Sequence, residues 1–170
     1  MDDCSRRQHG RLRLDRNRRE EFADTKRVST QEPRGPKPRI YREPGQAADD
    51  LASMIIGAAI AVHRVLGPGH LERVYERALV VELEFRGTQV QTQVAAEVHY
   101  RGIMVGESRI DMIVGEWVVV EIKAVERLST IHIAQALSYL KVTELPLALL
   151  INFNVPLLKD GVWRVVPPLI

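Results

Sequence analysis

The chain has 170 residues, 45% of them hydrophobic, which is enough for one domain with a buried core and an additional segment. The net charge is only +2, and the single cysteine, Cys4, excludes an internal disulfide, a cysteine-built zinc site and an iron–sulfur cluster. No signal peptide begins the chain, and no apolar run reaches the roughly 18 residues that a membrane helix needs. We therefore expect a cytoplasmic protein with no membrane contact.

The charge is distributed unevenly along the chain. Residues 1–46 carry 13 Lys and Arg against 8 Asp and Glu, whereas residues 47–170 carry 11 against 14. The first segment is poor in large apolar residues and ends in the proline-rich run PRGPKPRIYREPG, so it cannot offset the entropy of ordering. We predict a basic, disordered tail and linker over residues 1–46, either merely solvated or attractive to nucleic acid, and one folded domain over residues 47–170.

Two helices are predicted at the start of this domain. Asp49 and Asp50 can cap the first, in which apolar residues recur at helical spacing over residues 51–66. The glycines of GPG then break the helix. A second helix, ending near Gly87, places several apolar residues on one stripe, namely Leu71, Val74, Tyr75, Ala78 and Leu79.

Strand-like segments punctuated by glycines follow, over residues 89–97, 98–105, 107–114 and 117–124. Ser129 can cap a third helix, STIHIAQALSYLKV. The apolar run PLALLINF is typical of a buried strand, and GVWRVV of an edge strand. Because a helix between two strands favours a parallel crossover, we predict an α/β (mixed α+β) domain with a central mixed sheet flanked by helices.

Two strands of this pattern contain acidic residues among apolar ones. Asp111 lies within SRIDMIV, and the strand VVVEIK ends in Glu121 and Lys123, which share one face of the strand. A two-residue turn between the strands would place Asp111 and Glu121 on opposite faces. A three-residue turn (residues 115–117) or a bulge would bring them together. We predict the three-residue turn, because it alone gathers the charges.

Opposed residues on neighbouring strands have Cβ atoms roughly 4.5–5.5 Å apart, so the two carboxylates would repel unless a proton or a cation lay between them. Oxygen ligands at that spacing suit Mg²⁺ or Mn²⁺. The alternative is an exposed sheet face with ordinary charges. Two helical patterns favour the site. Glu72 and Tyr75 lie three residues apart on one face of the second helix. The third helix carries three candidate residues on a single stripe, His132, Gln135 and Tyr139.

Together these motifs resemble the GxxExxY family, a branch of the PD-(D/E)xK nuclease superfamily. Gly69, Glu72 and Tyr75 match the motif that names the family, Asp111 and EIK match the acidic and (D/E)xK motifs, and the third helix matches QxxxY. INFNVP is similar to the family's end, and Ile110 replaces the proline of the "PD" pair. The resemblance spans about residues 51–156 and implies a restriction-endonuclease-like fold.

The resemblance also implies roles for the matched residues. Asp111 and Glu121 would bind Mg²⁺ or Mn²⁺, with Glu72 joining them directly or through water, while Lys123 would orient the attacking water and stabilise charge on phosphorus. Gln135 and Tyr139 would position the substrate or the water, and Tyr75 and His132 would support the site or the substrate. We expect a Mg²⁺-dependent nuclease acting on nucleic acid, DNA in particular, in repair or defence. The alternative is a catalytically silent module that binds nucleic acid or protein. The sequence makes no prediction of the oligomeric state.

Overall fold

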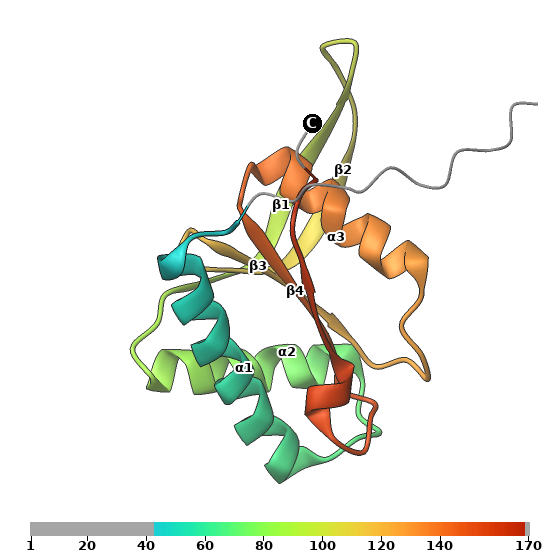
Figure 1. The fold of residues 1–170 in the computed structure, drawn as a ribbon. Helices are drawn as coiled ribbons and strands as arrows, with labels where there is room; N and C mark the ends of the chain where they lie inside the picture. Colours follow the sequence, from blue (N-terminus) through green and yellow to red (C-terminus); the bar gives the residue numbers. More distant parts are fainter. Residues whose placement is uncertain (1–42, 169–170) are drawn as a thin grey trace, which may run out of the picture. The chain divides into compact units, whose positions relative to one another are not determined.

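The computed structural model describes residues 43–168, so the tail expected over residues 1–46 lies almost entirely outside the described residues. The described part forms helices on both sides of a five-stranded sheet (Figure 1). In chain order the elements are α1 Gln46–Leu66, α2 Glu72–Phe85, β1 Val90–Tyr100, β2 Ile103–Val114, β3 Val118–Lys123, α3 Thr130–Thr143, β4 Leu147–Asn152, the short 3₁₀ helix η1 Leu158–Gly161, and β5 Val162–Val165.

The strands lie in the order β1-β2-β3-β4-β5. β3 and β4 run parallel and are joined through α3, while every other neighbouring pair is antiparallel. All six residues of β4 are buried, as its unbroken apolar sequence predicts, because helices cover both faces of the sheet there. The predicted mixed sheet flanked by helices is therefore confirmed.

Each face of the sheet has its own apolar core. The larger core lies beneath α1 and α2 and takes alternate residues of β3, Val118, Val120 and Ile122. The smaller core lies beneath α3 and takes Val119 from β3. Because side chains alternate along a strand, Glu121 and Lys123 belong to the α3 face.

The first helix begins one turn earlier than the predicted cap at Asp49 and Asp50. Gly45 occupies the N-cap position, without a side-chain hydrogen bond. Asp49 instead lies in the first turn, where a negative charge interacts favourably with the helix dipole, and it forms an ion pair with Arg164 of β5. By contrast, the predicted cap of α3 at Ser129 is confirmed.

The segments predicted as three strands between residues 89 and 114 form only two. β1 and β2 make one long hairpin whose turn is Arg101-Gly102, both with positive φ, as a tight two-residue hairpin turn requires (Figure 1). Gly106 does not end a strand; it pairs with Val98, next to a register shift between Val98 and His99. A bulge absorbs the extra residue, which is why this glycine resembles a strand break in the sequence.

Only part of the apolar stripe predicted for the second helix is buried. Tyr75, Leu79 and Leu83 are buried, but Leu71 and Val74 are exposed. The helix therefore has one apolar side in the core and a second one in solvent. Among the described residues, none of the helices has the length and apolar character needed to cross a membrane.

Gly161 provides a test of how closely the end of β4 packs against the segment that follows it. A Cβ at this position would lie 2.2 Å from the backbone carbonyl oxygen of Asn152. We expect Gly161→Ala to lower the free energy of unfolding by about 1–3 kcal/mol, because backbone must move to relieve the overlap. Urea denaturation measures the change. Gly106→Ala is the matched control, since nothing lies within 4 Å of its added methyl group, and equal losses in both variants would contradict the expectation.

Candidate active site

The turn between β2 and β3 sets the geometry of the site. Val114 pairs with Val118 and Met112 with Val120, so three residues, 115–117, form the turn. The predicted odd turn is confirmed. Continuing the same register places Asp111 opposite Glu121, at the point where the two strands cease to pair.

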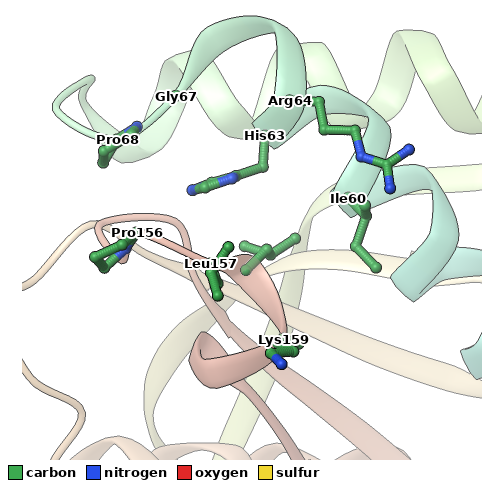
Figure 2. Close-up of a pocket in the computed structure, with 9 residues that line it drawn as sticks. Ile60, His63, Arg64, Gly67, Pro68, Pro156, Leu157 and Lys159 are labelled. Atoms are coloured by element: carbon green, nitrogen blue, oxygen red, sulfur yellow. The ribbon is translucent and has the colours of Figure 1, made fainter.

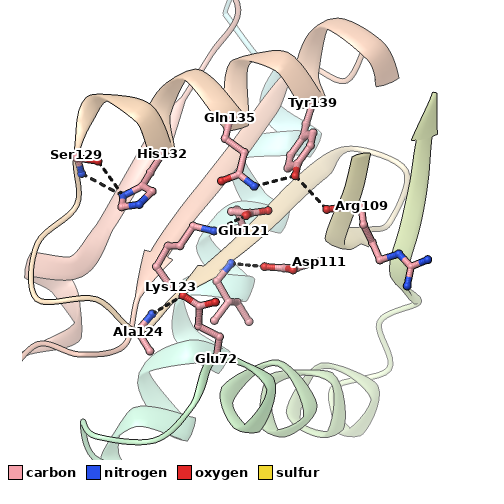
Figure 3. A network of polar contacts seen from close by, with 11 residues as sticks. Glu72, Arg109, Asp111, Glu121, Lys123, Ala124, Ser129, His132, Gln135 and Tyr139 are labelled. Carbon is pink, nitrogen blue, oxygen red and sulfur yellow. Dashed lines mark hydrogen bonds and ion pairs between the residues drawn. The ribbon is translucent and has the colours of Figure 1, made fainter. Parts of the chain in front are cut away.

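The regular alternation of side chains along β2 is interrupted at Asp111. Ile110 belongs to the core beneath α3, whereas Met112 belongs to the core beneath α1 and α2. The neighbouring residue of β1, Gln93, has φ +52°, and pairing with β2 is interrupted there. The Asp111 Oδ2 atom accepts a hydrogen bond of 2.8 Å from the backbone N–H of Ile122, so a side chain replaces a backbone partner on β3 (Figure 3).

Glu121 is the buried carboxylate of the site. Its residue is only 2% exposed, and its Oε1 accepts a hydrogen bond of 2.6 Å from Lys123 Nζ. Its Oε2 is buried and, among the described residues, has no hydrogen-bond partner. Burial, followed by repulsion from Asp111, raises the pKa of Glu121 to about 7.

The neighbouring ionisable groups have shifted pKa values as well. Burial raises the pKa of Asp111, although the Ile122 hydrogen bond and Lys123 oppose the rise. Burial alone would lower the pKa of Lys123, but its hydrogen bond to Glu121 and the surrounding carboxylates outweigh that effect and raise it. Lys123 therefore remains an ammonium at neutral pH.

Glu72, the first residue of α2, reaches the C-terminal end of β3, next to Lys123. Its Oε1 accepts a hydrogen bond of 3.0 Å from the backbone N–H of Ala124, directly after β3 (Figure 3). Its charge is close enough to raise the pKa values of Asp111 and Glu121. No three acidic, His or Cys side chains of residues 43–168 form a ready metal-binding group, so direct ligation by all three carboxylates is not present in this structure.

The α3 residues lie above Glu121, but they divide their roles differently from the sequence expectation. Gln135 Nε2 donates to the Tyr139 hydroxyl at 2.8 Å, and that hydroxyl donates to the Arg109 backbone carbonyl at 3.0 Å (Figure 3). Tyr139 is buried, and its hydroxyl proton is already engaged by the Arg109 carbonyl while the hydroxyl oxygen accepts from Gln135. Gln135 is partly exposed and keeps a free carbonyl oxygen.

Tyr75 and His132 hold parts of the chain near the site. Tyr75 is fully buried, stacks on Phe153 and donates from its hydroxyl to the backbone carbonyl of Gly67 at 2.7 Å, so a direct contact with substrate is excluded. His132 Nδ1 accepts a hydrogen bond from the backbone N–H of Ser129 at 3.1 Å, which fixes the start of α3. Both residues therefore support the structure around the site.

Asn152 is a buried polar residue near the site to which the sequence analysis assigns no role of its own. It is buried at the end of β4 beside Lys123, donates to the Val125 carbonyl at 2.8 Å and accepts from the Val125 N–H at 3.1 Å. This pair of hydrogen bonds fixes the chain as it leaves β3. The available signal was a polar residue ending an otherwise apolar buried strand.

A separate pocket of about 440 Å³ contains none of these polar residues (Figure 2). It lies between the end of α1 and the segment after β4, and His63 Nε2 reaches across to donate a 2.9 Å hydrogen bond to the Val155 carbonyl oxygen. Its lining is mainly apolar, with two basic side chains at its margin: Ile60, His63, Arg64, Gly67, Pro68, Pro156, Leu157, Leu158 and Lys159.

Comparison with known proteins agrees with this geometry. The family model described as the PD-(D/E)XK nuclease superfamily matches residues 49–165, which include all of the site residues. Comparison with curated proteins gives no significant match, and comparison with solved structures gives none either.

The raised pKa of Glu121 predicts how stability depends on pH. Because the folded state holds this proton more tightly than the unfolded chain, with pKa values of about 7 and 4.5, the free energy of unfolding falls as pH rises between them. We expect Glu121→Gln to remove much of this loss. Compared with its effect at pH 4.5, the substitution should be more stabilising by roughly 2–3 kcal/mol at pH 8. Denaturation at both pH values measures it. Glu126→Gln, an exposed control, should keep the wild-type slope; a wild type whose stability does not fall over this range contradicts the expectation.

Proposed function

Because the chain belongs to the PD-(D/E)XK nuclease superfamily, we propose that it hydrolyses phosphodiester bonds of nucleic acid, DNA in particular, with the help of a divalent cation. The observation that carries the proposal is the pair Asp111 and Glu121, opposed across two strands with Lys123 beside them. Repair or defence of the genome are the processes that such an activity would serve.

The residues present fit a hard divalent cation. Glu121 has a buried oxygen without a partner among the described residues, and Asp111 faces it. Burial raises the pKa values of both carboxylates, and Asp111 raises that of Glu121 further. A cation between them would relieve this repulsion, and Mg²⁺ and Mn²⁺ prefer carboxylate oxygens. Two carboxylates and retained waters are enough for Mg²⁺, and Glu72 would act on the cation through one of those waters. When bound, the cation would supply an activated water and neutralise charge on the phosphate.

Lys123 has an electrostatic role in this proposal. Its hydrogen bond to Glu121 and the neighbouring carboxylates raise its pKa, which favours an electrostatic role over that of a general base. Its ammonium is held by Glu121 at 2.6 Å and is only slightly exposed, so it points in a fixed direction. A fixed cation beside the phosphate stabilises the negative charge that develops during hydrolysis.

The surrounding residues would hold the substrate and the attacking water. Gln135 is oriented by Tyr139 and offers its free carbonyl oxygen as an acceptor for a water proton. On the other side of β3, a shallow pocket of about 340 Å³ is lined by His70, Leu71, Glu72, Arg73 and Ala124. The Arg73 guanidinium gives this pocket a donor for a backbone phosphate of the substrate.

Cleavage assays test the proposed activity. The full chain is incubated with linear, nicked and single-stranded DNA, and with RNA, in Mg²⁺, Mn²⁺ or EDTA. We expect cation-dependent cleavage, reduced about 100-fold or more in Asp111→Asn and in Lys123→Ala, because each removes a charge at the reacting centre. Glu116→Gln, in the exposed turn, is the control that should retain activity. Cleavage by both site variants at the wild-type rate would refute the assignment, and no cleavage by the wild type would favour the catalytically silent module.

Cation binding can be tested without any activity. At pH 8 we expect Mn²⁺ and Mg²⁺ to raise the melting temperature of the wild type, since binding to the folded state alone stabilises it by about 2.7 kcal/mol at a hundredfold excess over Kd. Asp111→Asn and Glu121→Gln should abolish the rise, while Glu126→Gln should preserve it. An equal rise in all four proteins would show that the cation binds elsewhere.

A further inference from the structure

The exposed side of α2 carries an unusually regular row of apolar side chains. Val74, Val81 and Phe85 are 37%, 66% and 87% exposed, and Ala78 lies between them, partly buried. The core-facing side of the same helix is Tyr75, Leu79 and Leu83, and Ala78 also packs against the core from the edge of the exposed row. We call the row Val74, Ala78, Val81 and Phe85 the α2 seam. In Figure 1, α2 lies at the margin of the sheet and helices.

The spacing of the seam is that of a coiled coil rather than of a core-facing helix. Successive members are four, three and four residues apart, which is the alternation of a and d positions in a heptad. Leu71, 63% exposed, extends the alternation by one more step towards the N-terminus. Such a row is suited to another helix that crosses it at a shallow angle.

The charges beside the seam indicate which helix that is. Arg77 and Glu84 each precede an a position, so both flank the seam on the same side, one heptad apart. Both are exposed, and neither has an ion-pair partner among the described residues. A row with one positive and one negative charge on the same flank is complementary to a copy of itself turned end to end.

We propose that two copies of this chain associate through antiparallel packing of their α2 helices. In this arrangement Val74 faces Phe85 of the second copy, and Ala78 faces Val81 of the second copy. Arg77 then lies between these two layers next to Glu84 of the second copy, and the two-fold axis repeats every contact. A self-complementary patch of this kind closes as a dimer and does not propagate.

Arg77 and Glu84 form no ion pair among the described residues of one copy and would pair with each other in the dimer. The apolar contacts of the dimer would bury the seam residues. The seam covers about two heptads, so the expected association is weak, and the dimer should appear as concentration is raised into the micromolar range. The seam does not include Asp111, Glu121 or Lys123, although Leu71, which extends it, also lines the pocket proposed for a substrate phosphate.

Sedimentation velocity of the full chain over a concentration series tests the proposal. We expect a monomer–dimer equilibrium in the wild type that Val81→Glu abolishes, because two carboxylates would be brought into the apolar layers. Val65→Glu is the matched control: Val65 is 83% exposed at the end of α1, outside the seam, and its replacement should leave the equilibrium unchanged. Circular dichroism confirms that each variant is folded.

Charge reversal tests the antiparallel register itself. Arg77→Glu alone and Glu84→Arg alone should each weaken the dimer about tenfold or more, since each sets like charges against each other twice. The combination of Arg77→Glu with Glu84→Arg restores opposite charges in both pairs and should recover the wild-type dissociation constant to within about threefold. A wild type that stays monomeric, a dimer that survives Val81→Glu, or a double variant as weak as the single ones would each overturn the proposal. A wild type that stays monomeric is also the result expected if another part of the same chain covers the seam.

Discussion

The buried carboxylate of Glu121 is the constraint around which the site is arranged. A charge at 2% exposure costs free energy unless it has partners, and within residues 43–168 only one of the two Glu121 oxygens has one, Lys123 Nζ. The protein tolerates this because the strand carrying Glu121 is held on every side. β4 pairs with it in parallel, and Asp111 binds the backbone N–H of the next residue. Such a position is costly for stability and therefore indicates a site built for a ligand or a reaction.

Much of the fold could be predicted because its strongest signals are local. The apolar run of β4, the cap at Ser129 and the crossover through α3 follow directly from periodicity and capping chemistry. The hairpin of β1 and β2 could not, because a bulge at Gly106 and a turn at Arg101 compete as breaks, and only cross-strand pairing decides between them. Leu71 and Val74 share a predicted stripe with buried residues and yet are exposed, because periodicity identifies an apolar stripe without saying what covers it.

The site was predictable to the extent that alternation along strands fixes it. Asp111, Glu121 and Lys123 meet because the turn after β2 has three residues. That length was predictable because it alone places the charged residues together. The hydrogen bonds that side chains make with backbone left no such pattern. The Tyr139 hydroxyl donates to the Arg109 carbonyl, and the Asn152 amide donates to the Val125 carbonyl in the segment after β3. Both bonds join residues far apart in sequence. Tertiary contacts of this kind carry no periodic signal.

The length of the turn after β2 has a consequence for how such a chain can vary over evolutionary time. Losing a single codon there would leave the composition and the local strand propensities nearly unchanged, yet it would rotate β3 by one place and send Glu121 towards the core beneath α1 and α2. A point substitution of an exposed turn residue such as Glu116 has no comparable effect. The site therefore depends on the residue count of this turn as well as on the acids, because a chain with all the charged residues but a turn one residue shorter would not bring Glu121 opposite Asp111.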